Sequence, residues 1–384
     1  MIYEHKHIAF GIENYNTLGL IRSLGEHGVK PICILIQGGS IRLASKSKWI
    51  GELHFVDSIE EGYKVIIQLF SAEINKPFLY ACDDKTTSFL DHHYHEIMDK
   101  FYFSNAGKDH RVTYYMNKNN INILALKYGL NVLNSWVVQK GGIPEDIEYP
   151  VITKSISSIE GGWKDDVFIC QNEEELTIAY EKIKSETVLL QKYLVKKNEL
   201  CLDGIIANHG DDFVITIAAT YNYILPDKYS NAMTFTNFTD SKLNKKINNM
   251  LREVGYTGIF CIEFLLDDEG KLYFCEVNFR NSGWSYASTR AGMPLPILWA
   301  KACLGELDTK KCIVEIPKGF TAIVEFADFD TRVRGKMISF GQWLKEVRSC
   351  NCLFYIGQKD WKPFFSFFYA KFIGKLGRML HIKK

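Results

Sequence analysis

Two apolar runs joined by a turn-rich group occupy residues 258–280, which read GIFCIEFLLDDEGKLYFCEVNFR. This pattern predicts a β-hairpin that turns at Asp267–Gly270. Side chains alternate between the two faces of a strand, so every second residue of the second run shares a face. The residues that alternation places on one face are Glu276, Asn278 and Arg280.

Glu263 lies on the first run of this hairpin. A turn centred on Asp268–Glu269 would set Glu263 opposite Phe274, on the face of Glu276 and diagonal to it. A turn of odd length would instead place Glu263 on the other face. Two carboxylates and an amide oxygen on one face suit a hard cation such as Mg²⁺, which is commonly shared with phosphates. The alternative is an acidic strand edge that faces solvent.

Composition limits the class of protein. The chain has 384 residues, of which 47% are hydrophobic, enough for more than one core. Lys and Arg total 46 against 45 Asp and Glu, and a net charge of +1 argues against a dedicated nucleic-acid binder. The ten cysteines form no CxxC pair, which argues against a zinc cluster. No signal-peptide pattern or membrane-length apolar run is evident, so we expect a cytoplasmic protein.

The first segment, residues 1–112, alternates strand and helix patterns. Short apolar runs at His7–Phe10, Lys30–Ile36 and Pro77–Cys82 predict strands of a parallel α/β layer. Ligands of such sheets bind beyond the carboxyl ends of the strands. We therefore expect candidate ligand positions at Asn14–Thr17 and Asp83–Lys85.

Two further segments follow. Residues 113–305 predict a domain with lobes at about 113–187 and 188–305, and residues 306–384 form a C-terminal extension in which Phe320–Phe329 alternates like a strand. In the first lobe, a helix from Lys118 to Gly129 precedes a strand that ends at Lys154. The glycine-bearing loop Ser155–Lys164 comes next, and its backbone amides could approach anionic oxygens.

The hairpin resembles the late signature of the ATP-grasp superfamily of carboxylate–amine or thiol ligases. An acid on one strand (Glu263) precedes the E-x-N-x-R-like run Glu276–Arg280, and weaker motifs upstream keep the same order. The resemblance covers roughly residues 114–305. It implies a mixed α/β and α+β architecture, in which a half-Rossmann domain precedes a two-lobed ATP-grasp fold.

The resemblance also implies which residues bind ATP. Lys118 and Lys154 match the two nucleotide lysines, and Gly161 and Gly162 lie in the loop that closes over the phosphates. The run before Glu199 matches the hinge that grips adenine, and Glu199 matches the acid that holds the ribose. The hinge residues are Gln191, Lys192, Tyr193 and Leu194. Gln191 departs from the family, which often has an acid there.

By the same resemblance, Glu263, Glu276 and Asn278 would hold one or two Mg²⁺ ions, for which Mn²⁺ could substitute. Three cations complete the expected catalytic set, namely Arg280, Lys228 and Arg290. The implied reaction activates a carboxylate on ATP as an acyl phosphate, which an amine then attacks. Two other readings stay open at this stage: carbamoyl-phosphate-synthase-like carboxyphosphate chemistry, and a non-catalytic ATP-binding sensor or scaffold.

The final stretch, residues 361–384, contains no Asp or Glu but six Lys and Arg among many aromatics. A helical stripe comprises Phe365, Phe368, Phe372, Leu376 and Met379, whereas Phe364 and Phe367 fall off it. The pattern is compatible with peripheral contact to the inner face of a membrane or with docking on the protein body. The expected partners are otherwise small-molecule carboxylates and amines and no nucleic acid, and a homo-oligomer is compatible with the sequence.

Overall fold

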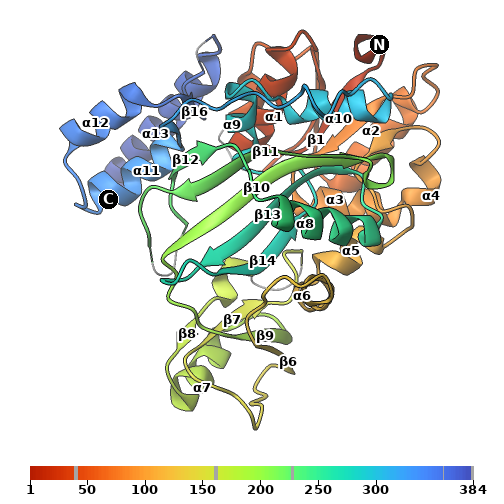
Figure 1. The fold of residues 1–384 in the computed structure, drawn as a ribbon. Helices are drawn as coiled ribbons and strands as arrows, with labels where there is room; N and C mark the ends of the chain where they lie inside the picture. Colours follow the sequence, from red (N-terminus) through yellow and green to blue (C-terminus); the bar gives the residue numbers. More distant parts are fainter. Residues whose placement is uncertain (39–41, 160–162, 226–228, 358, 382–384) are drawn as a thin grey trace.

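The computed structural model describes residues 1–38, 42–159, 163–225, 229–357 and 359–381. Within them the strands form three sheets, of five, seven and four strands. The seven-stranded sheet lies at the centre of the molecule, and the four-stranded sheet projects from one end of it as a small lobe (Figure 1). The mixed α/β architecture expected from the sequence is confirmed.

The N-terminal sheet has the order β3-β2-β1-β4-β5, and all its pairings are parallel. Its strands are β1 (His7–Ile12), β2 (Ile32–Ile36), β3 (Glu52–Val56), β4 (Phe78–Ala81) and β5 (Tyr102–Phe103). The helices of this region are α1 (Tyr15–Gly25), α2 (Ile59–Phe70), α3 (Asp84–His92), α4 (Tyr94–Ile97) and α5 (Arg111–Met116). Asn14 and Asp83 cap α1 and α3 directly after β1 and β4, so polar residues gather at the carboxyl edge of the sheet.

The small lobe is built on the antiparallel order β6-β9-β7-β8. Its elements are α6 (Lys118–Lys127), β6 (Ser135–Gln139), β7 (Val151–Ser155), β8 (Ile169–Cys170), α7 (Glu173–Lys182) and β9 (Thr187–Lys192). The predicted helix from Lys118 is confirmed, and α6 packs along the edge strand β14 of the large sheet.

The large sheet has the order β14-β13-β10-β11-β12-β15-β16. Its strands are β10 (Asn198–Ala207), β11 (Asp212–Tyr221), β12 (Ala232–Thr236), β13 (Gly258–Leu266), β14 (Leu272–Asn278), β15 (Phe320–Ile323) and β16 (Cys352–Leu353). The helices α8 (Ser241–Val254), α9 (Ser285–Arg290) and α10 (Leu295–Cys303) complete this region. One face packs on α8, and the other packs on α9, α10 and the N-terminal domain.

The C-terminal segment adds β15 and β16 to the large sheet and forms helices between and after these strands, at the far end of the sheet (Figure 1). These are α11 (Glu325–Asp328), α12 (Phe340–Ser349) and α13 (Lys362–His381), with a π-helical turn at Phe329–Arg334. The strand predicted for Phe320–Phe329 is wrong beyond Ile323. Glu325 is buried there and accepts backbone hydrogen bonds from Phe354, Tyr355 and Ile356, which holds the chain in a turn. The boundaries near residues 112 and 305 stay predictions.

In the described residues, the helices are too short or too polar to cross a membrane.

Candidate active site

The acidic hairpin forms as β13 and β14, but its register differs from the predicted one. The turn holds an odd number of residues, since Leu266 pairs with Leu272 and Phe264 pairs with Phe274. That register alone would place Glu276 on the face away from Glu263. A β-bulge at Cys275 restores the arrangement, because the next pair is Glu263 opposite Glu276. The shared face is therefore confirmed, and the predicted diagonal contact is corrected to a direct cross-strand pair.

The three predicted metal ligands lie together on this face. The Asn278 amide nitrogen donates to Glu263 Oε1 at 3.1 Å, and Lys118 Nζ lies 3.3 Å from Glu276 Oε2. Burial and the facing carboxylate of Glu276 raise the pKa of Glu263 well above its usual range. Burial alone would lower the pKa of Lys118, but attraction to Glu276 outweighs it and raises that pKa. Lys118 therefore stays charged beside Glu276.

Arg280 connects this acidic face to the N-terminal domain. Its Nε donates to Asp84 Oδ1 at 2.6 Å, and its Nη2 donates to the Asn278 amide oxygen at 3.1 Å. Asp84 is the first residue of α3, directly beyond β4, so it falls within the predicted ligand position at Asp83–Lys85. Burial would raise the pKa of Asp84, but the guanidinium of Arg280 overcomes this and lowers it. Sequence reasoning did not find the pairing of Asp84 with Arg280, because the two residues lie far apart in the chain.

The other ligand position predicted in the N-terminal domain, Asn14–Thr17, contacts the chain just after the hairpin. Asn16 donates to the carbonyl oxygens of Cys82 and Asn281, at 3.0 and 2.9 Å, and it accepts from the Asn281 amide at 2.5 Å. Asn281 directly follows Arg280 in the chain. The carboxyl edge of the parallel sheet is thus held against the end of the acidic hairpin.

The small lobe contributes Lys154 and Gln191. Lys154 Nζ donates to Gln191 Oε1 at 2.8 Å, from the neighbouring strands β7 and β9. The charge of Lys154 acts on the Cys275 thiol of the bulge, whose pKa is nonetheless raised to about 12, chiefly by burial. This thiol belongs to the site, and sequence reasoning missed it because strand alternation without a bulge turns Cys275 to the other face.

The hinge between the lobes runs from the end of β9 to the start of β10. The backbone N–H groups of Lys192 and Tyr193 donate to the carbonyl oxygens of Asn134 and Pro150, so these two groups are already paired within the protein. Leu194 follows them in the hinge, and its predicted contact with adenine stays a prediction. The Lys192 side chain is exposed and pairs with Glu148 at 2.6 Å. Glu199 is buried, accepts a hydrogen bond from Lys196 and acts electrostatically on Glu263.

One predicted catalytic residue, Arg290, lies away from the acidic face. Arg290 forms an ion pair with Glu26, 3.4 Å away at the end of α1, and so lies at the α1–α9 contact rather than among the acids. Gly161, Gly162 and Lys228 lie outside the described residues. The roles assigned to all these residues from the family resemblance stay predictions.

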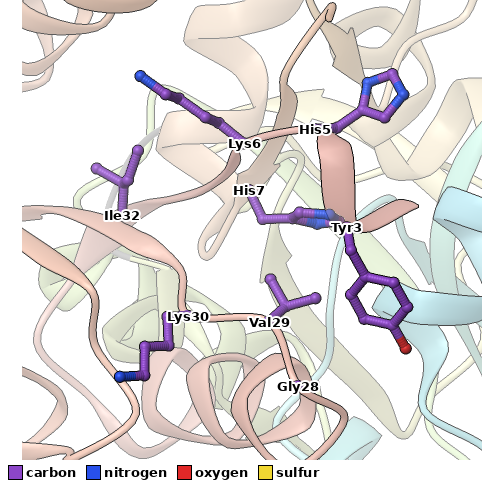
Figure 2. A pocket seen from close by; sticks show the side chains of 8 residues that line it. All are labelled: Tyr3, His5, Lys6, His7, Gly28, Val29, Lys30 and Ile32. Atoms are coloured by element: carbon purple, nitrogen blue, oxygen red, sulfur yellow. The ribbon is translucent and has the colours of Figure 1, made fainter. Parts of the chain in front are cut away.

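A cavity of about 190 Å³ lies at the opposite, amino-terminal edge of the parallel sheet (Figure 2). Residues of its lining include Tyr3, His5, Lys6 and Lys30, and Figure 2 shows the two lysine side chains directed away from each other. Ligands of parallel sheets bind at the carboxyl edge, so this cavity is not a candidate for the active site.

The acidic face offers some, but not all, of the ligands that a divalent cation needs. Among the described residues no group of three or more His, Cys, Asp or Glu forms a complete metal site. Two carboxylates and one amide oxygen are available, which is the partial set that Mg²⁺ uses when phosphate oxygens supply other positions. The Asn278 oxygen already accepts from Arg280 but has a second lone pair to offer.

The model of the family "Carbamoyl-phosphate synthase L chain, ATP binding domain" matches residues 116–309, about half of the chain. The chain belongs to this family. The ATP-grasp resemblance read from the hairpin is thereby confirmed, and the match includes Lys118, Glu263, Glu276, Asn278 and Arg280 but not Asp84 of the N-terminal domain.

Similar proteins agree with this assignment. The 2-oxoglutarate carboxylase small subunit of Hydrogenobacter thermophilus is 26% identical over 151 residues, which cover 36% of this chain and 31% of that subunit. The chain spans only 31% to 37% of the curated relatives that it matches.

Solved structures show the same ATP-grasp fold. N5-carboxyaminoimidazole synthetase of Staphylococcus aureus in complex with ADP aligns with a TM-score of 0.66 and 15% identity, over 86% of this chain and 85% of that one. The L-amino acid ligase of Bacillus licheniformis aligns with a TM-score of 0.63 and 14% identity, over 80% and 77%.

Proposed function

We propose that the protein is an ATP-dependent ligase that activates a substrate carboxylate as an acyl phosphate and joins it to an amine. The observation that carries the proposal is the pair Glu263 and Glu276 on one sheet face, with Lys118 and Arg280 beside it. Transfer of the γ-phosphoryl group requires carboxylates that hold a metal ion and cationic side chains that neutralise the phosphates. The expected partners are small molecules that supply the carboxylate and the amine.

Different residues of the site would bind the metal ion, the phosphates, the adenine base and the acyl phosphate. Glu263, Glu276 and Asn278 would hold Mg²⁺, which when bound neutralises the charge of the β- and γ-phosphates. Lys118 and Lys154 would bind phosphate oxygens from the small lobe, and the hinge at Leu194 would bind the base. Arg280 would bind and orient the acyl phosphate, since its guanidinium already faces the junction with the N-terminal domain.

The second substrate would enter from the N-terminal domain. The first turns of α1 and α3, which bear Asn16 and Asp84, contact the hairpin at Asn281 and Arg280. An amine bound there would lie at the carboxyl edge of the parallel sheet, which is the usual ligand position in such folds. The proposed ligase therefore places ATP between the lobes and the acceptor between the domains.

A second candidate is carboxyphosphate chemistry, in which bicarbonate is the activated carboxylate. It is supported by the names of relatives such as 2-oxoglutarate carboxylase and N5-carboxyaminoimidazole ribonucleotide synthase. Bicarbonate-dependent release of ADP, without any other carboxylate, would distinguish this chemistry from ligation of an organic acid.

The test is Mg²⁺-dependent ADP formation with a panel of carboxylates, bicarbonate and amines, followed by the mass of the product. Glu276→Gln should reduce turnover by about 100-fold or more, because one metal-binding charge is lost. Glu269→Gln, in the exposed turn of the same hairpin, is the matched control and should retain turnover. Full turnover by a folded Glu276→Gln protein would refute the proposal.

A further inference from the structure

One side of α13 presents aromatic rings to solvent. The exposed fractions are 49% for Trp361, 60% for Phe365, 54% for Phe368 and 66% for Tyr369. We call these four residues the aromatic face. Large side chains that are exposed together, rather than scattered singly, mark an interaction surface.

The opposite side of α13 fixes the helix on the protein. The rings of Phe364 and Phe367 lie 5.7 and 4.7 Å from that of Phe326, and Phe367 lies 4.7 Å from Tyr355. Ser366 Oγ donates to the Arg42 carbonyl oxygen at 2.7 Å. The two residues that fall off the predicted stripe are thus the ones that pack on the body. The stripe residues Phe365 and Phe368 stay free because the other side already holds the helix in place.

Exposed positive charge lies at the start of α13 and on the short segment that α13 contacts. Lys362 is exposed at the start of α13, and α13 packs on the short helix η2 (Ala44–Lys46), near which Lys46 and Lys48 are also exposed. Residues 361–384 contain no Asp or Glu that could offset these lysines. Lys371 is the exception among the described bases of α13, since it pairs with Asp330 at 3.3 Å. We call Lys46, Lys48 and Lys362 the basic rim.

We propose that the aromatic face of α13 docks the protein on the surface of a membrane that contains anionic lipid. Tryptophan, tyrosine and phenylalanine rings partition into the boundary between headgroups and acyl chains, and lysines beside them are attracted to anionic headgroups. The rest of the molecule stays in water, because the helix lies along its surface and is held there by Phe364 and Phe367.

Charge argues against a second copy of this chain as the occupant. A two-fold symmetric contact through this face would place each basic rim against its own copy. Residues 361–384 contain six Lys and Arg and no Asp or Glu, so the same segment of a second copy offers no acid to pair with them. An anionic lipid surface can take up the aromatic rings and attract the lysines at the same time.

The test is sedimentation of the full chain with vesicles of phosphatidylcholine alone or of equal parts phosphatidylcholine and phosphatidylglycerol. We expect binding to the mixed vesicles, weakened by salt. The triple variant Phe365→Ser, Phe368→Ser and Tyr369→Ser should reduce the bound fraction by about tenfold or more. The control is Tyr3→Ser, Leu69→Ser and Ile74→Ser, which removes apolar side chains that are also exposed but lie on the N-terminal domain.

Circular dichroism and sedimentation velocity of each variant complete the test. Unchanged spectra with selective loss of vesicle binding in the α13 variant support the proposal. Failure of the native chain to bind mixed vesicles overturns it, as does equal loss in both triple variants. Conversion of a native dimer to a monomer by the α13 variant, with vesicle binding unaffected, would assign the face to a second copy instead and also overturns it.

Discussion

At the scale of single residues, Asp84 is the side chain that joins the two halves of the proposed site. Its carboxylate is 16% exposed and receives the Nε hydrogen bond of Arg280, while the same guanidinium holds the Asn278 amide oxygen. Asp84 thus acts as a positioning residue for Arg280. A charge-assisted hydrogen bond of this kind contributes about 2 kcal/mol when partly buried.

Asp84→Asn should therefore destabilise the protein by about 2 kcal/mol at neutral pH and reduce ADP formation by about tenfold or more. The lowered pKa of Asp84 fixes the sign of the pH dependence. Its contribution is full above the ordinary pKa of Asp, about 4, and is lost as the pH falls through the lower folded value. Urea unfolding of both proteins over this range should show a gap that closes in acid.

The control for this variant is Asp211→Asn, which removes a 77% exposed carboxylate paired with Arg252. Exposed pairs contribute little, so its unfolding midpoint should follow the native protein at every pH. A gap between the native protein and Asp84→Asn that stays open in acid would show that the loss is not electrostatic.

Glu263 and Glu276 are the part of the candidate site that the sequence pattern predicts. Their types and spacing predicted a shared acidic face, and the structure confirms it. The pairing of Asp84 with Arg280 and the place of the Cys275 thiol could not be predicted, since one depends on docking between distant segments and the other on a bulge. Local alternation does not encode either feature.

At the scale of elements, α6 positions Lys118 through its amino-terminal cap. The Asn117 side chain accepts the N–H groups of Asn119 and Asn120 at 3.0 and 3.3 Å, and Lys118 is the first residue of the helix. Lys118 N–H also donates to the Ile156 carbonyl oxygen at 2.8 Å, at the start of the glycine-bearing loop. The cap therefore controls where the Lys118 ammonium meets Glu276.

Asn117→Ala should lower stability by about 1 kcal/mol and weaken ATP binding severalfold, because the first turn of α6 frays. Urea unfolding and calorimetric titration with Mg-ATP would measure the two effects. Ser58→Ala is the matched control, since Ser58 caps α2 of the N-terminal domain through the Glu61 N–H at 3.1 Å. It should lower stability similarly and leave ATP affinity unchanged, and equal loss of affinity in both variants would contradict the argument.

At the scale of the whole molecule, the sequence predicted the mixed α/β fold class but not how segments distant in the chain connect. Strands and helices of the first 305 residues could be predicted because their periodicities are local. A strand was predicted at β15, but its place in the large sheet was not, since pairing between distant segments leaves no local signal. The strand β16 was not predicted, because two residues are too few to show a periodicity. The docking of the C-terminal segment on α1 likewise depends on tertiary contacts alone.

That docking centres on Arg22, a fully buried residue of α1. Its guanidinium donates to Asp360 Oδ2 at 3.1 Å and to the carbonyl oxygens of Phe354 and Tyr355 at 2.7 and 3.2 Å. Asp360 in turn accepts from Ser47 Oγ at 2.7 Å. One buried ion pair thus joins the start of the chain to the segment that precedes α13.

Arg22→Met should destabilise the protein by about 3–5 kcal/mol, because it leaves the Asp360 carboxylate buried without its counter-charge. Urea unfolding measures the loss, and limited proteolysis should show earlier cleavage after β16. The double variant Arg22→Met and Asp360→Leu should recover much of the stability, since no unpaired charge remains in the interior. If the double variant is as unstable as Arg22→Met, the carbonyl hydrogen bonds of Arg22 rather than its charge hold the C-terminal segment in place.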